Sequence, residues 1–122
     1  MSREGGQGTV IILNDPPYGS ERSYNGLRLA GALAKDESVE LKVFLMGDSV
    51  ACARLGQETP KGYYNLERML RLVTNHGGEV GACGSCMDAR GLGDAALTDG
   101  VHRSSLDELA SWACWADKVI VF

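Results

Sequence analysis

The residues of this chain best suited to chemistry are two cysteines separated by two small residues, in the stretch Cys83-Gly84-Ser85-Cys86. A pair at this spacing is compatible with a disulfide switch, half of a metal site, or a thiol that carries sulfur. If a strand ends at Cys83 and a helix follows, unpaired backbone N–H groups and the helix dipole lower the thiol pKa of Cys83. Cys86 then lies on the same side of the first turn, close enough to resolve a bond formed at Cys83.

The context of the pair argues against two of these sites. A thioredoxin-type C-x-x-C follows an early strand and faces a cis-proline further along, whereas all three prolines here precede Cys83. A structural zinc site needs four ligands, usually in two close pairs, so a metal here would require distant loops to converge. The other cysteines and histidines are scattered: Cys52, His76, His102 and Cys114. We therefore predict neither metal nor cofactor, and burial of both cysteines in the core remains an alternative.

The order of the hydrophobic segments predicts the scaffold that positions this pair. Strands are expected at 9–15, 39–47, 79–83, near 101 and at 118–122, and helices at 20–34, within 47–56, at 63–75, 84–91 and 105–115. Strands that alternate with helices indicate a three-layer α/β/α fold with a mostly parallel sheet of four or five strands. We expect a single domain over residues 9–122 after a disordered start, residues 1–8. Reactive groups in such sheets gather beyond the carboxyl ends of the strands.

Finer expectations concern the helix ends and faces. Ser20 is expected to cap the first helix, and Asp48 or Ser49 the short helix after the second strand. A Glu67–Arg71 pair is expected on the outer side of the helix at 63–75.

A capping box at Ser105 and Glu108 opens the last helix. Its inward face is expected to hold Leu106, Leu109, Ala110 and Ala113. Of the two tryptophans at its end, Trp112 and Trp115, one is expected in the core and the other at a subunit contact.

Three further residues are candidates to line the cysteine site. Asp15 ends the first strand, and Tyr18 would stack over the sulfur if the first and third strands are neighbours. A stiff turn that merely covers the sheet edge is the equal alternative. His102 would act as a base from the neighbouring strand end, or else is a polar residue without chemistry.

The bulk composition excludes several classes of protein. The chain has 122 residues, of which 44% are hydrophobic, enough for one core without crosslinks. Twelve basic residues against 16 acidic ones give a net charge of -4, and without a basic run we expect no direct nucleic-acid binding. The apolar segments are too short for a bilayer and the start lacks a signal region, so we expect a cytoplasmic protein with no membrane partner and free thiols.

Three segments in order resemble the DsrE/DsrF-like sulfur-relay family, whose members include TusD-type sulfurtransferase subunits. They are "NDPPYGSERSYNGLRLA", "FLMGD" and "ACGSCMDARGL", and the likeness runs from about Thr9 to Phe122. In that family a cysteine between the third strand and the next helix accepts sulfur as a persulfide, and an Arg-Gly pair follows. Cys83 and Arg90-Gly91 match that pattern, while Cys86 departs from the TusD-type sequence and resembles a subgroup with a C-x-x-C.

The resemblance implies a persulfide carrier, a candidate sulfurtransferase that passes sulfur between donor and acceptor proteins as a homotrimer or homohexamer. Cys83 would carry the sulfur and Cys86 would resolve or assist. Arg90 would approach the site, or else cap the last carbonyls of the short helix. Asp48, at the second strand end, is a site-lining candidate or a cap. Two alternatives stay open: a non-catalytic subunit or binding module with structural cysteines, and a dithiol/disulfide redox protein.

Overall fold

Five parallel strands form the frame of the molecule, in the order β4-β3-β2-β1-β5. The structure is a computed structural model and describes residues 7–122. Its elements are β1 (Gln7–Leu13), α1 (Arg22–Ala34), β2 (Val39–Leu45), the 3-10 helix η1 (Gly47–Ala53), α2 (Leu66–Asn75), β3 (Glu79–Cys83), α3 (Gly84–Ala89), the 3-10 helix η2 (Asp94–Ala96), β4 (Val101–Ser104), α4 (Leu106–Trp115) and β5 (Lys118–Val121). The predicted α/β fold with a parallel sheet is confirmed.

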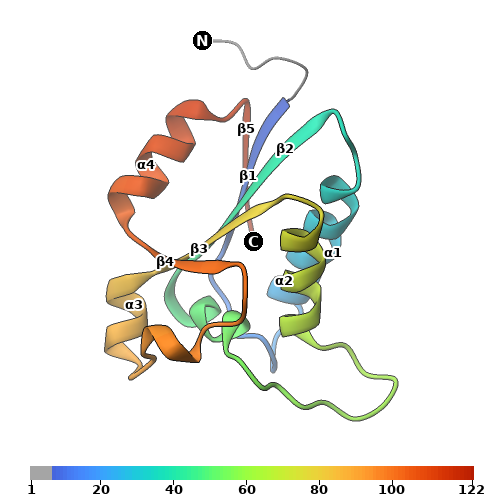
Figure 1. Cartoon of the computed structure of the whole chain (residues 1–122), viewed down its shortest axis with the longest axis vertical. Helices are drawn as coiled ribbons and strands as arrows, with labels where there is room; N and C mark the ends of the chain where they lie inside the picture. The colour runs from blue at the N-terminus through green and yellow to red at the C-terminus, as the bar shows by residue number, and fades with distance from the viewer. Residues whose placement is uncertain (1–6) are drawn as a thin grey trace.

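Helices cover both faces of this sheet, with α1 and α2 on one side and α4 on the other (Figure 1). One row of neighbours in register is fully buried below α1 and α2: Ile11, Val43 and Val80. The opposite face carries Phe44 and Gly81, also in register, below α4. There the Trp112 ring meets Phe44 edge-on, with ring centroids 6.1 Å apart. Both faces of the central strands are therefore apolar, which explains their continuous aliphatic runs.

The edges of the sheet are less covered than its centre. β5 pairs with β1 alone, and its Val119 and Val121 are 45% and 61% exposed. Scattered exposed apolar residues are ordinary, but two on one edge strand leave a surface able to pack against another chain.

Several element ends differ from the predicted ones by one to three residues, and the starts of β1 and α2 illustrate this. β1 begins at Gln7, two residues earlier than expected, and the predicted disordered start otherwise lies in residues 1–6, outside the described residues. α2 begins at Leu66, three residues later than expected, because the Asn65 side chain accepts a hydrogen bond from the backbone N–H of Arg68 (3.1 Å) and caps the helix there.

Two of the predicted side-chain caps are replaced by other hydrogen bonds. α1 starts after Glu21, whose side chain makes no cap, while the Ser20 hydroxyl accepts from the N–H of Arg22 (3.2 Å) one residue further out. Ser49 does not cap η1, because its hydroxyl donates to the carbonyl of Leu13 (2.6 Å). This bond ties η1 to the carboxyl end of β1.

The predicted Glu67–Arg71 pair is wrong. Glu67 is only 5% exposed, and its carboxylate accepts hydrogen bonds from the backbone N–H groups of Gly56 (3.1 Å) and Gln57 (2.9 Å). The long connection between η1 and α2 folds back over the start of α2, which the period of the helix alone does not reveal. A buried carboxylate is tolerated there because backbone donors satisfy it.

The cap of α4 is as predicted, but its inward face is not. The Ser105 side chain accepts from the N–H of Glu108 (3.2 Å). Leu109 is buried as expected, and it is joined inside by Trp112. Three residues expected to face inward are exposed: Leu106, Ala110 and Ala113. The indole of Trp112 thus packs against the sheet, and the two alanines are exposed.

Candidate functional site

The cysteine pair lies at the junction between β3 and α3, at the carboxyl edge of the sheet. Cys83 ends the strand and takes the N-cap position with an extended backbone (φ -58°, ψ 118°), and Cys86 lies in the first turn. The Arg103 side chain lies against Gly84, where a Cβ would come within 2.7 Å of its Nε atom. The strand-to-helix junction predicted for this pair is therefore present.

Hydrogen bonds from neighbouring groups lower the pKa of the Cys83 thiol, although the residue is only 6% exposed. Burial by itself raises the pKa of this thiol, but hydrogen bonds from the Ser85 side chain and the Cys86 thiol, and from their backbone N–H groups, outweigh it and lower the pKa. The Ser85 hydroxyl oxygen lies 3.4 Å from Cys83 Sγ. Cys83 is thus the cysteine of the pair that more readily becomes a thiolate.

Cys86 has the opposite tendency. Burial raises its pKa, and the hydrogen bond from its thiol to Cys83 raises it further, while the backbone N–H of Gly47 and the charge of Arg90 act against the rise. The Gly47 N–H donates to Cys86 Sγ at 3.2 Å, and Gly47 holds the left-handed conformation (φ +60°) that presents it. Cys83 is therefore expected to lose its proton before Cys86 does.

Arg90 fastens α3 to η1 and does not bind Cys83. Its Nη1 donates to the carbonyl of Cys86 (3.0 Å), and its Nε and Nη2 both lie 2.9 Å from the Asp48 carboxylate. Of the two roles expected for Arg90, the structure thus shows the second, in which the side chain bonds to a carbonyl of the short helix. It also removes Asp48 from the capping role, since Asp48 is the partner of Arg90.

Arg103 is the residue at this site that the sequence did not reveal. From β4 it donates two hydrogen bonds to Asp88 (3.0 and 2.8 Å), and it lies 3.4 Å from Asp94. The hydrogen bond with Arg103 lowers the pKa of Asp88. Arg103 thus fixes α3 and η2 to the edge of the sheet. The sequence offered one indication of this role, a basic residue next to the strand expected near Val101. Its partners Asp88 and Asp94, however, lie in other elements, α3 and η2.

Asp15 and Tyr18 do not join the pair through neighbouring strands. The expectation that the first and third strands are adjacent is wrong, because β2 lies between β1 and β3. The Tyr18 hydroxyl donates to Gln57 (2.6 Å), and its ring stacks on Tyr64 with centroids 6.0 Å apart. The Asp15 carboxylate accepts from Ser20 (2.7 Å). Tyr18 thus packs with the connection before α2, which is the covering role.

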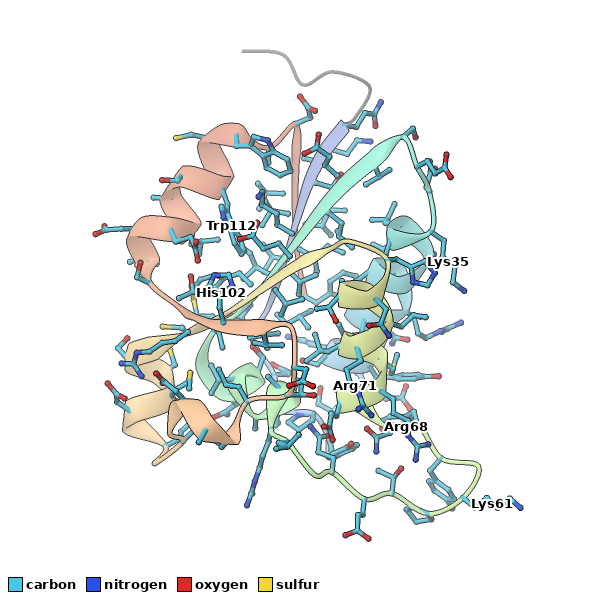
Figure 2. The ribbon with its side chains drawn as sticks, in the orientation of Figure 1. Lys35, Lys61, Arg68, Arg71, His102 and Trp112 are labelled. Carbon is cyan, nitrogen blue, oxygen red and sulfur yellow. The ribbon has the colours of Figure 1, made fainter. Side chains whose placement is uncertain are left out.

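His102 is engaged by α4. It pairs with Gly81 across the sheet, and its Nε2 lies 2.5 Å from Oε1 of Glu108, which also accepts from the Ser104 hydroxyl. Figure 2 shows His102 on β4 and Trp112 on α4 in the same space between strand and helix. The contact docks α4 onto the sheet, and no hydrogen bond joins His102 to the cysteines among the described residues.

Glu79, His102 and Glu108 bring three possible metal ligands within 4.8 Å of one another. A cation already occupies this place: the Lys42 ammonium lies 2.8 Å from Glu79. It also lies 5.3 and 4.7 Å from the ring centroids of Trp112 and Trp115. The group is therefore a partly exposed ion-pair cluster beside α4.

The other two cysteines lie apart from the pair. Cys52 is fully buried, and burial raises its pKa to about 12. Cys114 is exposed on α4, and all four cysteines are free thiols. Only Cys83 and Cys86 therefore combine proximity with polar surroundings.

Comparison with known proteins agrees with this fold. The model of the DsrE/DsrF-like family matches residues 7–122. The chain belongs to the DsrE/DsrF-like family. Protein YchN of Escherichia coli K12 is 44% identical over 117 residues, which cover 95% of this chain and 99% of YchN. The crystal structure of YchN has a TM-score of 0.90 at 43% identity and covers the same shares.

A second relative comes from Methanopyrus kandleri. The uncharacterized protein MK0008 of Methanopyrus kandleri is 36% identical over 113 residues, which are 93% of this chain and 92% of MK0008.

Among residues 7–122, no helix is long and apolar enough to cross a membrane.

Proposed function

We propose that this protein carries sulfur as a persulfide on Cys83 and passes it between donor and acceptor proteins. The observation that supports this most is the Cys83 thiol itself, whose pKa is lowered by donors at the end of β3. Membership in the DsrE/DsrF-like family, generally related to sulfur relay, points the same way.

The surroundings of Cys83 suit each requirement of a persulfide carrier. Its thiolate attacks the outer sulfur of a donor persulfide, and the donor thiolate leaves. Because Cys83 is only 6% exposed, a bound persulfide is sheltered from small thiols in solution. The carried sulfur then leaves by attack of an acceptor thiolate, in the reverse of the loading step.

The partners in this proposal are proteins, including further copies of the chain. Exposed apolar residues on α4 and β5 offer a surface for a homotrimer or homohexamer: Leu106, Val119 and Val121. The free thiols suit a reducing compartment, which is why we place the protein in the cytoplasm.

One observation favours a second function, that of a dithiol/disulfide redox protein. The thiol of Cys86 donates to Cys83, as a resolving cysteine does. The content of sulfane sulfur after loading separates the two functions, because a redox protein gains none.

The test measures loading of Cys83 by intact mass. The Cys86→Ser, Cys114→Ser variant is treated with a cysteine desulfurase and cysteine, because neither a resolving thiol nor the exposed Cys114 can then interfere. We expect a gain of the mass of a sulfur atom that a reductant removes. The matched control adds Cys83→Ser and should gain nothing. Equal gain in both variants, or no gain in either, rejects the proposal.

A further inference from the structure

Cys86 is placed to attack the sulfur that would hold a persulfide. Cys86 lies in the first turn of α3, three residues after Cys83, which takes the N-cap position of the same helix. Residues three apart on a helix have Cβ atoms about 5–6 Å apart, whereas a disulfide needs a Cβ separation of about 3.5–4.5 Å. A bond between these two sulfurs therefore requires the first turn of α3 to close by about 1–2 Å.

Two polar groups beside Cys86 oppose the burial and the neighbouring Cys83 thiol, which together raise the pKa of Cys86. The Gly47 N–H donates to Cys86 Sγ at 3.2 Å, and hydrogen bonds of this kind strengthen as charge develops on the acceptor. The guanidinium of Arg90 is held at the Cys86 carbonyl and adds positive charge nearby. A carrier that only passes sulfur to an acceptor protein has no use for a second thiol three residues after the first.

We propose that Cys86 releases the sulfur carried on Cys83 as hydrosulfide, a step that rests on the persulfide function above. The Cys86 sulfur bonds to Cys83 Sγ, and the bond between Cys83 Sγ and the outer sulfur breaks. The outer sulfur leaves with the electron pair and the thiol proton of Cys86, as HS⁻. The two cysteine sulfurs are oxidised to a disulfide, and the carried sulfur is reduced from the sulfane state to sulfide.

This chemistry assigns the protein a place between two classes of reaction. A sulfane-sulfur donor must load Cys83, and a dithiol reductant must reopen the disulfide. Cys86 is half-buried and Cys83 buried, so the reductant is expected to attack Cys86. Cys83 then departs as the thiolate with the lower pKa, which is the better leaving group.

The experiment loads the full chain briefly with inorganic polysulfide, removes the excess, and follows mass and free sulfide without added thiol. Cys114→Ser is present throughout, because the exposed Cys114 would itself take up sulfur. With Cys86 present, we expect the added sulfur to give way to the loss of two hydrogens, with one sulfide released per chain. The rate should not depend on protein concentration. With Cys86→Ser, the persulfide should last roughly 100-fold longer or more.

The outcomes separate this step from the function on which it rests. If Cys86→Ser loads, and the protein with Cys86 keeps its persulfide equally long, the release step is wrong and the carrier function stands. A rate that rises with protein concentration also overturns the step, because the attack is then between chains. If Cys86→Ser does not load, both proposals fail.

Discussion

At the scale of single residues, the two cysteines are distinguished by what donates to each. Cys83 receives hydrogen bonds from Ser85 and Cys86, whereas Cys86 receives one from the N–H of Gly47. The same C-x-x-C spacing thus holds two thiols of different acidity. In the proposed function, this difference makes Cys83 the nucleophile that accepts sulfur and Cys86 the resolving thiol.

The alkylation rate of Cys83 should follow the lowered pKa. With Cys114→Ser as background, we expect its reaction with iodoacetamide to rise with pH with a midpoint below about 8.5, the value of an ordinary thiol. Cys86→Ala removes a donor and should move the midpoint upward. Cys86→Ser keeps a hydroxyl donor and should move it less. Identical midpoints in all three proteins would contradict the role of the Cys86 donor.

Glu108 should make stability depend on pH at the acid end. Burial raises its pKa, but hydrogen bonds from Ser104 and His102 and the charge of Lys42 outweigh burial and lower the pKa. A carboxyl with a lowered folded-state pKa stabilises the fold above its unfolded pKa, about 4.3, and this stabilisation is lost as pH falls through the folded pKa.

The measurement for Glu108 is urea unfolding at several pH values. Glu108→Gln should lower the free energy of unfolding at about pH 6 by about 1–3 kcal/mol, and the deficit should shrink below about pH 4. The exposed Glu58 supplies the matched control, and Glu58→Gln should leave the unfolding free energy within about 0.5 kcal/mol. A deficit that is constant across pH would show that the charge of Glu108 is not involved.

Much of the cysteine site could be predicted at this scale, and its outer contacts could not. The local spacing around Cys83 was enough to predict a strand end, a helix start and a lowered pKa. Gly47 donates to Cys86 from 39 residues away, and Arg103 lies against Gly84 from another strand, so only the fold reveals them. Tyr18 was misplaced for the same reason, since its partners lie in a distant connection.

At the scale of elements, the approach of α4 to the sheet depends on a glycine. A Cβ at Gly81 would lie 2.9 Å from the Cβ of Ser104 and 3.2 Å from Cη2 of Trp112. The large ring of Trp112 thus fills the space that a side chain on β3 would take. The ion-pair cluster of Lys42 and Glu79 lies on the same face.

Gly81→Ala should therefore destabilise the protein. We expect a loss of about 1–3 kcal/mol in the free energy of unfolding, measured with denaturant, because the new methyl group forces α4 or β4 outward. Gly93→Ala is the matched control, since a Cβ at Gly93 meets nothing within 4 Å. If both variants unfold at the same denaturant concentration, the close approach is not needed for stability.

The orientation of α4 shows why helix faces are harder to predict than helix positions. Its capping residue Ser105 fixed the start correctly. Its sequence, however, has apolar residues around most of the helix. Either the face with the alanines or the face with Trp112 can therefore be expected to pack against the sheet. The pocket over Gly81 decides in favour of Trp112, and that pocket exists only once β3 and β4 are paired.

At the scale of the whole molecule, strand order is the property that the sequence left open. Alternating strands and helices predict a parallel sheet, but each crossover can pass either way along it. The observed order places β3 at one side of β2 and β5 beyond β1. The cysteine pair and the exposed edge strand therefore belong to opposite sides of the sheet.

The proposed homo-oligomer should depend on this exposed edge. Val121→Lys places a charge on β5, where the valine is 61% exposed, and should reduce the mass in light scattering to that of one chain. Tyr63→Lys, at a 70% exposed side chain on the connection before α2, should leave the assembly intact. An oligomer that survives Val121→Lys and dissociates with Tyr63→Lys would place the interface at the other side.

The position of the two tryptophans makes the packing of α4 measurable by intrinsic fluorescence. The chain has only two, and both lie in α4, where Trp112 is buried against Phe44 and Trp115 is in contact with the Lys42 ammonium. Intrinsic fluorescence therefore reports whether α4 rests on the sheet, while alkylation or mass reports the state of Cys83. Detachment of this helix and chemistry at the sulfur can thus be followed in the same sample without an added label.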